Sequence, residues 1–99
     1  MTWKQEAETA VETVKGLLEQ SPIDLIQVDQ AALALKELAE TSPDAFKAHP
    51  PHQSIQEVDL RLANAKDEIW SAVLAIAKRD TNVAYDRLKL AQEWLNVSV

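Results

Sequence analysis

The chain has 99 residues, of which 46 % are hydrophobic, and it carries a formal net charge of −6 with no cysteine. This length suits a single domain spanning residues 1–99, and the hydrophobic content is too high for a disordered chain. The lack of cysteine excludes disulfides, zinc ribbons, iron–sulfur clusters and thiol chemistry. The net negative charge disfavours direct binding to nucleic-acid phosphates.

Two helices are predicted in the first half of the chain. Apolar residues recur there at intervals of three and four, which predicts a helix over residues 3–20 with Thr2 as its N-cap. The stretch "SPID" then carries start signals, because Ser21 can cap a helix and Pro22 suits a first helical position. We therefore expect the second helix over residues 22–40.

A short turn at 43–48 and a Pro-Pro hinge are predicted to join the two halves. A residue before proline is pushed out of the helical region, so the helix must stop before Pro50 and Pro51. His49 and His52 flank this hinge, and the two prolines between them hold the segment extended. A zinc site needs three or four ligands, and no nearby acid has a diagnostic spacing. We interpret the segment as a joint between helices, with a metal site as the lesser alternative.

The second half of the chain is predicted to contain two more helices. A capping box that starts at Ser54 precedes a helix over residues 55–79. Polar, cap-forming residues at 80–82 indicate a break before a last helix over 82–96, although one continuous helix over 55–96 remains an alternative. The predicted fold class is all-α, a small antiparallel bundle of about four helices.

The two later helices differ from the earlier ones because each carries a second apolar face. In helix 55–79 this second set is centred about 120° from the main stripe, at 100° per residue. Surplus apolar area marks an interface, and tryptophan and arginine are enriched at binding hot spots. We predict six interface residues, namely Leu60, Trp70, Leu74, Arg87, Leu90 and Trp94.

Two explanations for the surplus faces stay open. A second copy of the chain could bury them, which would make the protein a homodimer. Alternatively, the first two helices and the turn around Phe46 could cover them within one molecule.

The charge is uneven along the chain. Residues 1–49 hold nine acids against four lysines, a balance of −5, whereas residues 50–99 hold seven acids against six bases, a balance of −1. A basic partner surface would complement the first half, although mild acidity also simply keeps a small protein dispersed.

The sequence offers no pattern for catalysis. One glycine cannot build a phosphate-binding loop, no serine sits in a glycine elbow, and no Glu-x-x-His pair is available for a di-iron site. We therefore expect no enzyme and no cofactor.

The predicted function is a small non-catalytic protein–protein interaction module of adaptor, inhibitor or immunity type. We expect it to self-associate through its last two helices. One alternative is an acidic inhibitor or DNA mimic that binds a basic partner surface. The other is a ligand-binding or metal-binding helical bundle, in which tryptophans could line a groove.

We expect a cytoplasmic protein that does not enter membranes. The first residues lack a basic segment followed by an apolar run, and no window approaches 18 consecutive apolar residues.

Overall fold

The computed structural model describes residues 3–41 and 57–96, without the side chains of 57–61. These residues form four helices: α1 (Trp3–Leu18), α2 (Leu25–Glu40), α3 (Glu57–Ala77) and α4 (Thr81–Asn96). The predicted turn at 43–48 and the Pro-Pro hinge with its two histidines lie outside the described residues.

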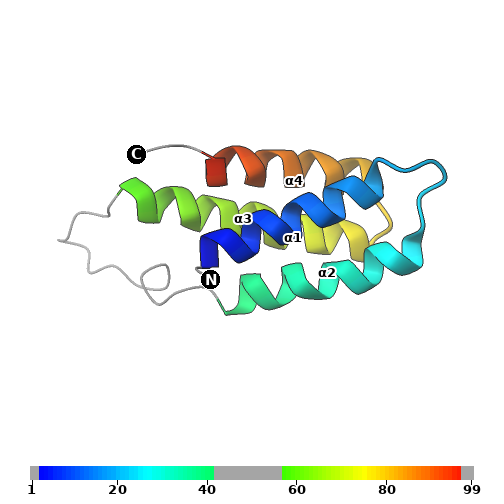
Figure 1. The fold of residues 1–99 in the computed structure, drawn as a ribbon, viewed down its shortest axis with the longest axis horizontal. Helices are drawn as coiled ribbons and strands as arrows, with labels where there is room; N and C mark the ends of the chain where they lie inside the picture. The colour runs from blue at the N-terminus through cyan, green and yellow to red at the C-terminus, as the bar shows by residue number, and fades with distance from the viewer. Residues whose placement is uncertain (1–2, 42–56, 97–99) are drawn as a thin grey trace.

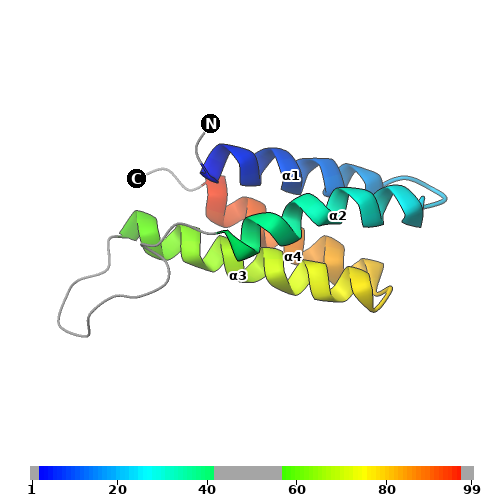
Figure 2. The ribbon, with the colours of Figure 1, turned by 90° about the horizontal axis from the view of Figure 1, so that it is seen from below.

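The four helices run up and down in turn and form a ring in the order α1, α2, α3, α4 (Figures 1 and 2). Each helix packs against its two neighbours in this ring, and α3 packs most extensively against α4. The arrangement confirms the predicted all-α antiparallel bundle. Within the described ranges, no helix combines the length and apolar character that would let it cross a membrane.

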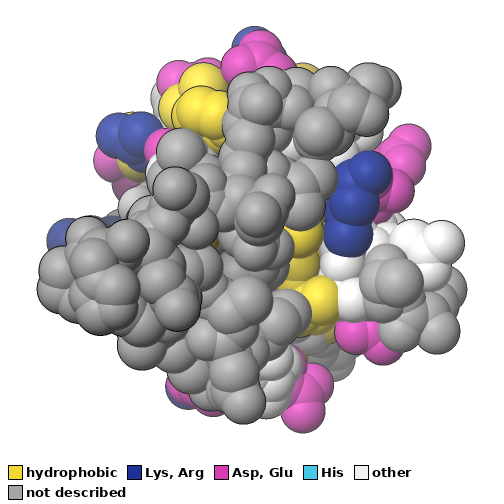
Figure 3. Space-filling model, turned by 90° about the vertical axis from the view of Figure 1, so that its left-hand side faces the viewer, with side chains coloured by type: hydrophobic (Ala, Val, Ile, Leu, Met, Phe, Trp, Pro, Cys, Tyr) yellow, Lys and Arg dark blue, Asp and Glu magenta, His cyan; other side chains and the backbone are white. Residues whose placement is uncertain are grey.

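The core lies along the axis of the ring, and every helix contributes a row of residues spaced three or four apart. The largest fully buried side chains are Val11, Val14, Val28, Leu35, Ile69, Leu88 and Leu95. Alanines fill many of the remaining core positions, including Ala7, Ala65, Ala72, Ala84 and Ala91, which lets the helices approach closely. In the end-on view of Figure 3, hydrophobic side chains are visible near the middle and at the upper left, and most of the charged side chains lie toward the outline.

Helix α2 begins at Leu25, three residues later than predicted, because a different residue caps it. The Asp24 carboxylate accepts hydrogen bonds from the backbone amides of Ile26 and Gln27 at 3.1 and 3.2 Å. Asp24 has extended backbone angles, as an N-cap requires, so Pro22 lies before the helix. Helix α1 also ends earlier than predicted, at Leu18 instead of residue 20.

The predicted break between the last two helices is confirmed, and it lies at residues 78–80, slightly earlier than predicted. The amides of Asp80 and Arg79 donate to the carbonyls of Ala75 and Ile76 at 2.9 and 3.0 Å, which is a Schellman motif. Its left-handed position is Arg79, with φ 62°. Asp80 then caps α4 through a 3.2 Å hydrogen bond from the Val83 amide. Arg79, predicted in the last turn of a helix over 55–79, therefore lies in the turn.

Candidate interaction surfaces

The outer side of α3 exposes two large apolar residues one turn apart. Trp70 is 40 % exposed and Leu74 is 45 % exposed. The core positions of α3 include Ile69, which is fully buried. At 100° per residue Leu74 points about 140° away from Ile69, so its side chain is directed away from the core. Among the described apolar residues of the predicted interface, these two are the most exposed.

A second apolar row lies on α4, on the flank that faces α3. Val83 and Leu90 are both exposed on this row, and Arg87 lies between them. Arg87 shows which way this row faces. Its Nη1 donates to Glu68 Oε2 of α3 at 3.3 Å, so this flank of α4 lies beside α3. Trp94 is only half-buried and packs against the core cluster, so much of its area is used inside the monomer.

The exposed pair on α3 and the apolar row on α4 do not form one continuous surface. Trp70 lies two residues, or about 200°, from Glu68, whose side chain meets α4. Trp70 therefore lies on the flank of α3 away from α4, on the side of α2. The side chain of Leu60, the sixth predicted interface residue, lies outside the described part of the molecule.

Helix α2 adds an apolar residue that the sequence analysis missed. Leu33 is 66 % exposed and lies off the apolar stripe of its helix. Asp29, one turn earlier, receives both guanidinium nitrogens of Arg79 at 2.6 and 2.9 Å, which shows that this flank of α2 faces α3. Because α2 and α3 are antiparallel neighbours and Asp29 meets the turn after α3, we expect Leu33 to lie near the level of Leu74. We name Leu33, Trp70 and Leu74 the α2–α3 apolar face.

Two of the polar contacts at the surface shift the pKa values of the groups that make them. The hydrogen bonds from the Arg79 guanidinium hold the pKa of the Asp29 carboxyl below its usual value, and Asp29 in turn raises the pKa of the guanidinium. On the other side of the ring, the Tyr85 hydroxyl of α4 donates to Glu19 Oε1 at 2.9 Å. This hydrogen bond, followed by desolvation and the negative charges of Glu19 and Asp86, raises the pKa of Tyr85.

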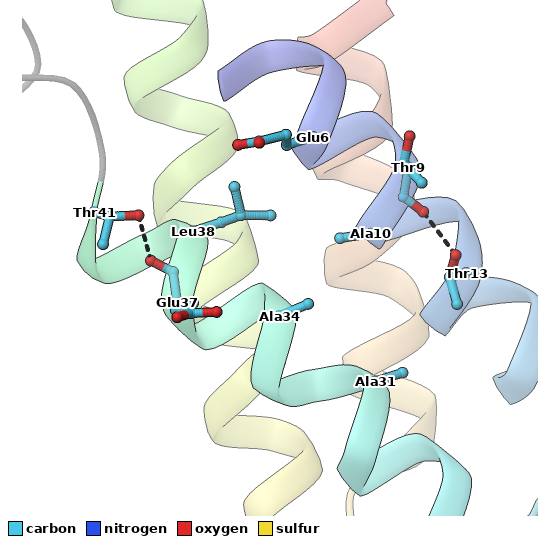
Figure 4. A pocket seen from close by; sticks show the side chains of 9 residues that line it. All are labelled: Glu6, Thr9, Ala10, Thr13, Ala31, Ala34, Glu37, Leu38 and Thr41. Carbon is cyan, nitrogen blue, oxygen red and sulfur yellow. Dashed lines mark hydrogen bonds between the residues drawn. The ribbon is translucent and has the colours of Figure 1, made fainter. Parts of the chain in front are cut away.

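An open groove of about 490 Å³ runs along the outside of the α1–α2 pair (Figure 4). Small side chains line it, among them Thr9, Ala10 and Thr13 from α1 and Ala31 and Ala34 from α2. Leu38 closes its floor near one end. We name this feature the α1–α2 groove.

Two carboxylates flank the end of the α1–α2 groove nearest the start of α1. Glu6 reaches from α1 across the groove toward α2, and Glu37 lies on α2 beside Thr41 (Figure 4). Both glutamates are exposed. Within the described ranges, neither carboxylate makes an ion pair.

Little else in the described residues resembles a chemical site. No group of three or more histidine, aspartate or glutamate side chains there could hold a metal ion. A smaller hollow of about 290 Å³ lies where α1 ends and α4 begins, beside Tyr85. No tryptophan lines this hollow or the α1–α2 groove. Trp3 instead packs against the core, and its indole donates to the Leu38 carbonyl at 2.9 Å.

No family model, no curated protein and no solved structure matches this chain.

Proposed function

We propose that the protein is a non-catalytic protein–protein interaction module that self-associates through the outer side of α3, the first of its last two helices, together with α2 beside it. The observation that carries this proposal is the exposure of Trp70 and Leu74 side by side on α3. Large apolar side chains that are exposed together, rather than singly, mark an interface. Leu33 of α2 extends the same face, so the area available for burial spans two helices.

The charges around this face favour a second copy of the chain as the partner. Residues 57–96 hold seven acids and six bases, so two such halves can meet with little repulsion. Residues 3–41 hold eight acids and three lysines, and two of those halves would repel each other. Near the α2–α3 apolar face both signs occur, with Lys36 and Glu37 on α2 and Lys66 and Asp67 on α3. In a twofold dimer each sign can therefore face its opposite.

The test is the solution mass by light scattering over a concentration series. We expect a dimer for the native chain and a dissociation constant raised at least about 30-fold by Trp70→Gln with Leu74→Gln, as for hot-spot residues worth 2 kcal/mol or more. Circular dichroism should stay helical, because both side chains point away from the core.

A matched variant identifies the surface. Val83→Gln with Leu90→Gln makes the same chemical change on the α4 row, and we expect it to leave the dimer intact. If the α4 variant dissociates the dimer instead, the interface is the α4 row with Arg87 and Leu90. A native chain that stays monomeric throughout the series contradicts self-association.

A further inference from the structure

The α1–α2 groove has the form of a docking site for an extended partner and not that of a small-molecule pocket. On α2 its lining runs from Ala31 to Thr41, a rise of about 15 Å at 1.5 Å per residue. The groove is open to solvent along this length. Deep pockets that bind small molecules enclose most of their ligand and direct a few polar groups onto it, whereas most side chains along this groove are small alanines and threonines.

The threonines of the groove contribute methyl groups more than hydroxyls. Thr9 Oγ1 donates to the Gln5 carbonyl at 3.1 Å, and Thr13 Oγ1 donates to the Thr9 carbonyl at 2.9 Å. Thr41 Oγ1 donates in the same way to the Glu37 carbonyl at 2.7 Å. Because each hydroxyl is already bonded to its own helix, the methyl groups and the alanines between them provide the contact surface. Small side chains on both walls let a partner backbone come close.

The charge around the groove defines the partner's chemistry. Glu6 and Glu37 present carboxylates at one end, and the α1–α2 half of the molecule has a balance of eight acids to three lysines. An anionic or neutral partner would leave these carboxylates without a counter-charge. A cationic side chain that lies over Glu6 and Glu37 would form ion pairs at the rim while apolar side chains fill the groove.

We propose that the α1–α2 groove binds an amphipathic helix of a partner protein, with small apolar residues on its inner face and lysine or arginine beside that face. Helix-in-groove recognition uses this arrangement, in which residues at i, i+3, i+4 and i+7 anchor in an apolar groove. The site lies on the opposite half of the ring from α3 and α4. Helix α2 contributes to both sites, with Leu33 in the proposed dimer face and Ala34 and Glu37 in the groove, but each proposal has its own variants, so either can fail while the other holds.

The probe is a pair of fluorescent synthetic helical peptides of about four turns, with the same alanine and leucine face. One peptide carries lysines beside that face, and the other carries glutamates at the same positions. Fluorescence anisotropy with the full chain should show saturable binding of the cationic peptide. The anionic peptide should bind at least about tenfold more weakly, which is 1.4 kcal/mol. No saturable binding of the cationic peptide, or equal binding of both peptides, overturns the proposal.

Two variants locate the binding. Ala34→Leu fills the groove from an exposed position, so the fold should persist while peptide affinity falls at least about tenfold. Glu6→Gln with Glu37→Gln should weaken binding several-fold and reduce its dependence on salt. The matched control, Glu12→Gln with Glu40→Gln, removes the same charge from the same two helices outside the groove. Equal effects of the two glutamine pairs, or full binding by Ala34→Leu, would show that the groove is not the site.

Discussion

At the scale of the residue, the single tyrosine of the chain reports on the contact between α1 and α4. Tyr85 donates to Glu19, and this hydrogen bond stabilises the neutral phenol relative to the phenolate. Its pKa in the folded protein is therefore above that of an unfolded tyrosine, which is about 10. The contact therefore stabilises the fold fully at pH values below the unfolded pKa of about 10. This stabilisation is lost as pH rises through the higher pKa of the folded protein.

We predict that the alkaline titration of Tyr85, followed by the ultraviolet absorbance of tyrosinate, gives a midpoint above the usual value. The chain has one tyrosine, so the signal belongs to this residue alone. Glu19→Ala should lower the midpoint toward that of an unfolded chain. Glu12→Ala removes an acid from α1 away from Tyr85 and should leave the midpoint unchanged. A native midpoint that equals that of the Glu19→Ala variant would contradict the contact.

Arg79 shows two functions combined in one residue. Its backbone occupies the left-handed position that ends α3, where glycine is the usual residue. Left-handed geometry costs a residue with a side chain about 1–2 kcal/mol. The side chain of Arg79 offsets part of this cost, because its guanidinium holds Asp29 and thereby ties the α3–α4 turn to α2. A glycine there would satisfy the backbone but could not make this contact.

At the scale of the element, the start of α2 was a choice between two capping residues. Ser21 and Asp24 both have the chemistry of an N-cap. The structure selects Asp24, whose carboxylate accepts from two backbone amides that would otherwise lack a partner in the helix. A carboxylate also interacts favourably with the positive end of the helix dipole, which a serine hydroxyl does less well.

The effects of Asp24→Ala and Ser21→Ala on the free energy of unfolding distinguish the two candidate caps. Asp24→Ala should lower the free energy of unfolding by about 1 kcal/mol, the usual cost of removing an N-cap. Ser21→Ala should change it by less than about 0.5 kcal/mol, because Ser21 lies exposed outside the helix. Both values follow from urea denaturation monitored by circular dichroism. A larger loss for Ser21→Ala than for Asp24→Ala would place the start of the helix at Pro22, as the sequence pattern suggested.

At the scale of the whole molecule, residues of the same type and on the same helix differ in burial. Leu33 and Leu35 lie two positions apart on α2, yet Leu35 is fully buried in the ring and Leu33 is exposed. At 100° per residue they point about 200° apart, so one faces the core and the other faces away from it. The same alternation separates Ile69 from the exposed residues of α3.

We therefore predict very different costs for the same substitution at these two leucines. Leu35→Ala should lower the free energy of unfolding by about 2–5 kcal/mol, because it opens a cavity in the core. Leu33→Ala should cost less than about 0.5 kcal/mol in the monomer. Thermal unfolding at low protein concentration, where any dimer is dissociated, measures both. Similar costs for the two variants would contradict the orientation of α2 in the ring.

The sequence by itself determined the helical type and the approximate limits of the helices, and it identified the surplus apolar faces over 55–96, but it left open whether that stretch is one helix or two. These properties follow from spacing along one helix, which is a local quantity. The exposure of Trp70 and Leu74 was foreseeable for the same reason, since one stripe on each helix already suffices for the core. Their role at an interface remains a prediction.

Only the tertiary structure decided which helix each flank faces. It placed Trp70 and Leu90 on different sides of α3, it added Leu33 to the face of Trp70, and it kept half of Trp94 inside the monomer. It also left an open groove between the alanine-rich walls of α1 and α2. The physical reason is that the order of helices around the ring and the distance between neighbours depend on the packing of all four together. No single helix carries that information in its own periodicity.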